Sequence, residues 1–127
     1  MAIIKDRKIF LQWFKYEEFN SPDEPFSYKK MEEELLKRLD FARTIAGIPF
    51  KITSGYRSRM HNRKVGGKPT SSHCKGLAAD IYVKDNNSRS IILNALIKAR
   101  FNRIGIGKDF IHVDVDNNKS QDRIWLY

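Results

Sequence analysis

The sequence has little cysteine, no long apolar run and no internal repeat, as is usual for a globular protein. Its one cysteine, Cys74, excludes an internal disulfide framework and suits a reducing compartment. No stretch approaches the roughly 20 apolar residues that a membrane span requires, so membrane insertion is not expected. Charged residues already occur within residues 1–7, which predicts that no signal peptide is present. With no internal repeat, the 127 residues predict one domain, residues 1–127, in which residues 1–27 form an arm that packs on the core.

Acidic residues are outnumbered by basic ones. The chain has 24 Lys and Arg against 15 Asp and Glu, a formal net charge of +9. Such a surface favours an anionic partner: nucleic acid, anionic lipid or an anionic cell-wall polymer. Small proteins without a polyanionic partner can also be this basic. Because no nucleic-acid-binding motif is recognisable, we expect no specific nucleic-acid partner.

The apolar patterning predicts an α+β fold with a small, largely antiparallel sheet and flanking helices. Helices are expected at 28–46, between an N-cap at Ser27 and a stop at Gly47, and at 88–100, capped by Ser88. The residues of these helices expected to face the core are Met31, Leu35, Leu39, Ala42, Ile92, Leu93, Leu96 and Ile97. Strands are expected at 50–53, 78–83, 103–107, 110–115 and 123–126, and the basic stretch 56–72 is expected to be a loop.

Two of the three histidines lie close to aspartates, beside or within predicted strands. His73 precedes Asp80 by seven residues, with Gly76 and two alanines between them, and small residues allow two segments to approach closely. In the strand at 110–115, alternation places the aliphatic residues on one face and His112 and Asp114 on the other. Two imidazoles and one carboxylate would make an open zinc site, in which the metal lowers the pKa of a water and polarises a carbonyl.

A zinc site of this kind also needs a base and a group that stabilises an oxyanion. Asp109, three residues before His112, and Asp114 are both candidates for the base. Arg57, at the end of a predicted strand, is the candidate for the oxyanion. Trp125 and Tyr127 are interpreted as sheet-packing residues rather than as the lining of a groove.

These residues resemble the M15 peptidases, the group of D-Ala-D-Ala carboxypeptidases and L-alanyl-D-glutamate endopeptidases, which share a zinc site with Hedgehog domains. The resemblance covers about 50–115 and agrees in the order and spacing of its motifs. It is carried by Ser54-Gly55-Tyr56-Arg57-Ser58, Asn62-x-x-Val65-Gly66-Gly67, Ser71-x-His73-x-x-Gly76-x-Ala78-x-Asp80 and Phe110-Ile111-His112-Val113-Asp114.

The resemblance implies a role for each matching residue. It implies one zinc ion held by His73, Asp80 and His112, and a carboxylate base at Asp109, where some members carry glutamate. Asp114 would orient a ligand. Arg57 would bind a substrate carboxylate or stabilise the oxyanion, and Ser71 would bind substrate or brace its loop.

The resemblance further implies a zinc metallopeptidase that hydrolyses the peptide stem or cross-link of bacterial peptidoglycan. The alternative is a non-catalytic, zinc-containing module that binds the cell wall or belongs to a phage particle, because fold alone does not guarantee chemistry. The small size is most similar to phage and prophage members, such as endolysins. Such a protein would stay in the host cytoplasm until lysis or travel with the virion, and we expect it to be a monomer.

Overall fold

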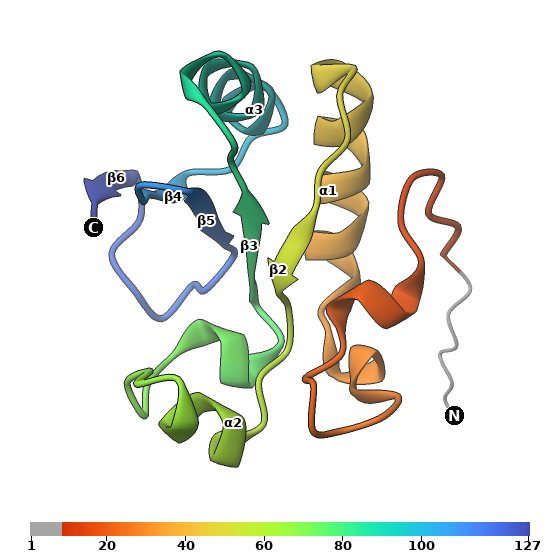
Figure 1. Ribbon diagram of the computed structural model, residues 1–127, viewed down its shortest axis with the longest axis vertical. Coiled ribbons are helices and arrows are strands. Elements are labelled where there is room, and N and C mark those ends of the chain that lie inside the picture. Colours follow the sequence, from red (N-terminus) through yellow and green to blue (C-terminus); the bar gives the residue numbers. More distant parts are fainter. Residues whose placement is uncertain (1–8) are drawn as a thin grey trace.

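The computed structural model describes residues 9–127, so the first eight residues of the expected N-terminal arm lie outside the described residues. Its five strands form one sheet in the order β2-β3-β5-β4-β6 (Figure 1). Every pairing is antiparallel except that of β6 with β4, which is parallel. The strands are β2 (Ile52–Ser54), β3 (Ala78–Tyr82), β4 (Arg103–Ile106), β5 (Phe110–Asp114) and β6 (Arg123–Leu126). The predicted α+β class, with its largely antiparallel sheet, is confirmed.

Helix α1 (Glu33–Ala46) begins five residues later than the sequence predicts. Ser27 starts a separate 3-10 helix, Ser27–Lys30, and the chain is then extended at Met31 and Glu32. A tertiary contact accounts for the delay, because the Glu32 N–H donates to the carbonyl of Gly76, 2.9 Å away. The predicted stop is confirmed: Gly47 ends the helix in the left-handed conformation, with φ of 70°.

Helix α3 (Asn86–Lys98) starts earlier than predicted, with Asp85 rather than Ser88 at its N-cap. The Asp85 carboxylate accepts from the Ser88 N–H at 2.8 Å, and the Ser88 hydroxyl accepts from the Asp85 N–H at 3.2 Å. The buried face also differs in part from the prediction. Ile92 and Leu96 are buried as predicted, whereas Ile97 is 46% exposed and Ala95 faces the core.

The stretch 56–72 is not entirely a loop. It contains helix α2 (Arg59–Lys64), whose N-cap Ser58 accepts a hydrogen bond from the His61 N–H at 3.0 Å. A short 3-10 helix, Ser72–Lys75, follows. Sequence reasoning gave too much weight to the glycines and proline at 66–69, which lie after α2 and not within it.

The sheet separates a core from a cleft. On one face, aliphatic residues of β3, β4 and β5 pack against α1 and α3, which also contact each other. Leu11, Phe14 and Phe19 of the N-terminal segment join this core. The opposite face carries Asp80 and His112, which lie on the polar side of their strands as alternation requires. Among the described residues, no helix has both the length and the apolar character of a membrane span.

Candidate metal centre

Three side chains from different elements converge on the open face of the sheet. His73 comes from the 3-10 helix Ser72–Lys75, Asp80 from β3 and His112 from β5, directly opposite Asp80 in the strand pairing. Nε2 of His73 lies 3.2 Å from Oδ1 of Asp80, and Nδ1 of His112 lies 2.9 Å from the same oxygen. Potential ligand atoms of all three lie within 4.8 Å of one another, so the group could hold a metal ion.

The second nitrogen of each imidazole is anchored away from this point. Nδ1 of His73 lies 2.8 Å from the Gly55 carbonyl, and because a carbonyl only accepts, this nitrogen is the donor. Nε2 of His112 lies 2.8 Å from Oδ2 of Asp114. Metal-ligating histidines commonly donate their other N–H to a carbonyl or carboxylate, which fixes tautomer and orientation. One carboxylate and two imidazole nitrogens held in this way fit zinc, with a fourth position open.

Asp114 is itself held by further contacts. Its side chain is 1% exposed, and its Oδ1 accepts from Nε of Arg103 at 2.6 Å and from the Asp116 N–H at 3.2 Å. Oδ2 is the oxygen that faces His112. Both oxygens therefore have partners, and Oδ2 is in place to orient His112.

The electrostatics of the metal-free pocket keep Asp80 ionised. Burial raises the pKa of Asp80, but hydrogen bonds with His112 and His73 outweigh it and hold that pKa well below its usual range. Burial lowers the pKa of His112, yet its hydrogen bonds with Asp114 and Asp80 reverse this effect and raise the pKa above the ordinary value. A metal ion would compete with protons for His112.

Arg57 lies beside the group as expected from its position after β2. Its Nη2 is 3.6 Å from Oδ2 of Asp80. Its Nε donates to the Ser54 hydroxyl at 3.1 Å, and its Nη1 donates to Oδ1 of Asn62 at 3.2 Å. Asn62 is buried in α2, so the helix that sequence reasoning missed helps β2 to fix the guanidinium.

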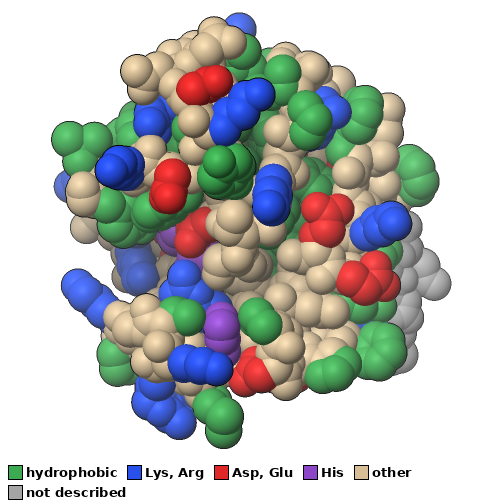
Figure 2. Space-filling model, viewed as in Figure 1, with side chains coloured by type: hydrophobic (Ala, Val, Ile, Leu, Met, Phe, Trp, Pro, Cys, Tyr) green, Lys and Arg blue, Asp and Glu red, His purple; other side chains and the backbone are tan. Residues whose placement is uncertain are grey.

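The cleft around the group has a volume of about 390 Å³ and includes Ser71 in its lining. The Ser71 hydroxyl accepts from the His73 N–H at 3.2 Å, so it braces the turn that carries His73. Figure 2 shows a hollow at the left of the view where histidine, acidic and basic side chains gather. The basic residues that line the cleft are Arg57, Lys68, Arg103 and Lys119.

Asp109, the expected base, does not lie over the metal group. It lies exposed in the turn between β4 and β5, where its carbonyl accepts from the Val83 N–H at 2.8 Å, and it does not line the cleft. The next residue, Phe110, does line the cleft, so the turn borders it. Within residues 9–127, the Asp109 carboxylate has no hydrogen-bond or ion-pair partner.

A comparison with protein families decides the assignment. The model of the Peptidase M15 family matches residues 12–114, which include the metal group, Arg57 and Ser71. The chain belongs to the M15 peptidase family. No curated protein matches the sequence.

The M15 match confirms the resemblance at the level of the family, whose members are typically zinc-dependent. It ends at Asp114, the last residue of β5. The loop after β5 and strand β6 lie beyond it, yet Trp125 and Tyr127 line the cleft of this M15 peptidase. Sequence reasoning assigned both to sheet packing. Their spacing of two residues, which puts both on one face of a strand, was the signal that could have revealed them.

Proposed function

We propose that the protein is a zinc-dependent peptidase that hydrolyses the peptide stem or cross-link of bacterial peptidoglycan. The observation that carries this proposal is the group of His73, Asp80 and His112, whose outer nitrogens are anchored and whose open side faces a cleft. Family membership supports peptide-bond hydrolysis as the reaction.

The basic lining of the cleft supports a substrate that carries carboxylates. Zinc bound by the three side chains would supply Lewis acidity, which polarises the scissile carbonyl and makes water a better nucleophile. Arg57 donates to the developing oxyanion or to a substrate carboxylate, and its hydrogen bonds to Ser54 and Asn62 keep it in place. Stem peptides of peptidoglycan carry free carboxylates, which suit Arg57, Lys68 and Lys119 at this cleft.

Asp109 is the group that we propose as proton acceptor. Both oxygens of Asp114 are already occupied, whereas the Asp109 carboxylate is unpaired among residues 9–127 and belongs to a turn that borders the cleft. Asp109 takes the proton that the attacking water loses and passes it to the leaving amine. This assignment requires the exposed side chain to turn into the cleft when substrate is bound.

The proposed function is tested by mass spectrometry of purified peptidoglycan after incubation with the zinc-loaded protein, beside a chelated control. New stem-peptide fragments that disappear on chelation support the proposal, and their masses identify the scissile bond. A D,D-carboxypeptidase releases a terminal D-alanine, whereas an L-alanyl-D-glutamate endopeptidase cuts within the stem. Zinc binding with no cleavage of several wall types would contradict the proposal and favour a wall-binding module.

Two conservative substitutions should separate the roles of the two carboxylates. Asp109→Asn is expected to lower kcat by about 10²–10⁴-fold and to leave zinc affinity unchanged, because a general base contributes on that scale.

Asp114→Asn is expected to weaken zinc binding by about 10–100-fold, because it removes the anion that orients His112. Steady-state kinetics and competitive zinc titration measure the two effects. Full activity in Asp109→Asn would assign the proton to another group.

A further inference from the structure

The C-terminal strand brings two aromatic residues to the face of the sheet that carries the metal group. One row across the sheet runs from Asp80 on β3 through His112 on β5 and Gly105 on β4 to Trp125 on β6. Across the sheet, the carboxylate of Asp80 is therefore followed by the imidazole of His112, then by Gly105, which has no side chain, and then by the indole of Trp125. Figure 1 shows β6 at the outer edge of the sheet, beyond β4.

Gly105 provides the room that the indole occupies. A Cβ at this position would lie 2.6 Å from Nε1 of Trp125 and 2.6 Å from Cε2 of Tyr127, too close for either side chain to remain in place. The absence of a side chain at Gly105 therefore lets both rings lean over β4 towards His112. The ring of Trp125 lies 5.7 Å from the imidazole of His112, and the ring of Tyr127 lies 6.4 Å from it.

Other contacts hold these rings as a wall. The Arg103 guanidinium, already bound to Asp114, lies 4.9 Å from the centroid of the Trp125 ring. The ring of Tyr127 lies 4.9 Å from that of Phe110 and 6.3 Å from that of Trp125. We call Phe110, Trp125 and Tyr127 the aromatic wall. It gives a cleft that is otherwise polar and basic one apolar side, built of rings inclined to one another by 49° (Phe110 and Tyr127) and 61° (Trp125 and Tyr127).

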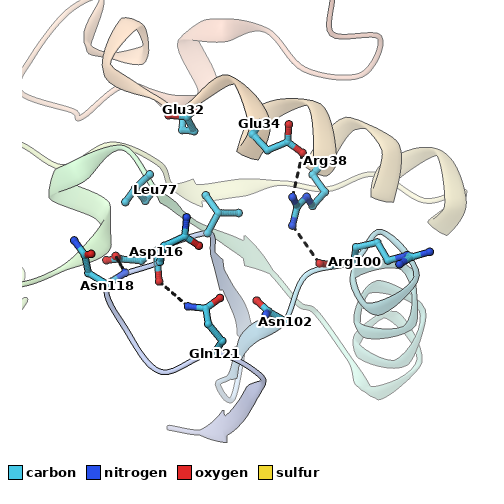
Figure 3. A pocket seen from close by; sticks show the side chains of 11 residues that line it. Glu32, Glu34, Arg38, Leu77, Arg100, Asn102, Asp116, Asn118 and Gln121 are labelled. Atoms are coloured by element: carbon cyan, nitrogen blue, oxygen red, sulfur yellow. Dashed lines mark hydrogen bonds and ion pairs between the residues drawn. The ribbon is translucent and has the colours of Figure 1, made fainter.

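The loop that leads to β6 has a second polar face. Within residues 115–122, Lys119 lines the cleft, whereas Asn117, Asn118 and Gln121 line a second cavity of about 540 Å³. Figure 3 shows side chains that line this cavity, among them the amides of Asn102, Asn118 and Gln121. Side-chain amides both donate and accept hydrogen bonds, as the hydroxyl and acetamido groups of amino sugars require. Nε2 of Gln121 already donates to the carbonyls of Asp116 and Lys119, so Gln121 would contribute its Oε1 as an acceptor.

We propose that the aromatic wall is a saccharide subsite that binds the amino sugar bearing the stem peptide, an inference that rests on the proposed function. A pyranose ring presents a flat C–H face to an aromatic ring and hydroxyls at its rim, a combination that suits an aromatic surface bordered by polar groups. Residues of one loop line both the cleft that holds the wall and the amide-lined cavity, Lys119 the first and Asn118 and Gln121 the second.

Two of the three rings of this subsite lie beyond the part that identifies the family, whereas Phe110 lies within it. Residues 12–114 match the family model and supply the metal group, whereas Trp125 and Tyr127 lie beyond the match. A saccharide bound at the aromatic wall, beside His112, favours a scissile bond close to the sugar. Within a peptidoglycan stem, such a bond lies near the first amino acids and not at the terminal D-alanine.

The test compares one stem peptide in two forms, free and carrying N-acetylmuramic acid. We expect the wild-type protein to hydrolyse the saccharide-bearing form with a kcat/KM at least about tenfold higher, mainly through a lower KM. Trp125→Ala should bring the ratio of the two kcat/KM values towards one. The matched control is Trp13→Ala, which removes a tryptophan that packs on Arg43 and bonds to Thr44, away from the cleft. An unchanged ratio in Trp125→Ala would overturn the proposal.

A binding measurement on the metal-free protein separates this inference from the proposed function. In a Trp13→Phe background, Trp125 is the remaining tryptophan, and the muramoyl peptide should change its fluorescence whereas the free peptide should not. Saccharide binding without hydrolysis of either form would contradict the proposed function alone. Hydrolysis of both forms at equal kcat/KM, with no fluorescence change, would contradict the subsite alone. If Trp125→Ala does not fold, Tyr127→Ala, at an exposed position of the same wall, replaces it.

Discussion

Replacing His112 with alanine is expected to lower kcat/KM by at least about 10³-fold, because a catalytic metal supplies several kcal/mol of transition-state stabilisation. The substitution removes one of three nitrogen and oxygen donors and leaves Asp80 without the neighbour that lies 2.9 Å from it. It also leaves Asp114 with Arg103 as its remaining charged partner. Hydrolysis kinetics with and without added zinc measure the effect, and excess zinc should not restore activity.

His61→Ala provides the matched control for this variant. His61 lies on α2, half-buried, and is not part of the cleft lining. It should retain zinc binding and activity, and circular dichroism should show that both variants keep the native secondary structure. Substantial zinc-dependent activity in a folded His112→Ala protein would remove His112 from the metal site.

The second large effect is expected at Arg57. Arg57→Ala should lower kcat/KM by about 10²–10³-fold, the usual cost of losing a donor that stabilises an oxyanion. Arg57→Lys should recover little of this loss. The planar guanidinium donates to Ser54 and Asn62 and still has N–H groups for the substrate, whereas a lysine ammonium cannot reproduce this arrangement. Both variants should bind zinc with an affinity close to that of the wild-type protein.

Kinetics and zinc titration together distinguish the role of Arg57 from a structural one. Arg59→Ala, an exposed position at the start of α2, is the control for loss of positive charge near the cleft. A fall in kcat indicates that Arg57 acts in the transition state, whereas a rise in KM alone indicates substrate binding. Activity within twofold of the wild-type value in Arg57→Ala would contradict both roles.

The sheet and the metal group could be predicted because local patterns determine them. Alternation at 110–114 was sufficient to place Ile111 and Val113 in the core and His112 on the open face. The motif spacing then brought His73, Asp80 and His112 to one point. The start of α1 could not be predicted, because it depends on a hydrogen bond between Glu32 and Gly76, 44 positions apart in the chain.

The surroundings of the metal group were less predictable for a similar reason. Asp109 has the right sequence distance from His112, but the strand register places it opposite Val83 in an exposed turn. The aromatic wall depends on β6 pairing parallel with β4 and on the space above Gly105, and neither is encoded near Trp125. Sequence spacing identifies ligands, whereas the shape of the cleft depends on contacts between distant segments.

The claim on which the account rests is that His73, Asp80 and His112 form one metal centre. An anomalous difference map at the zinc absorption edge, from crystals of the zinc-loaded protein, tests it most directly. The account predicts one strong peak about 2.0–2.2 Å from Nε2 of His73, a carboxylate oxygen of Asp80 and Nδ1 of His112. A fully loaded protein with no peak at this point, or with its peak on other residues, would contradict it.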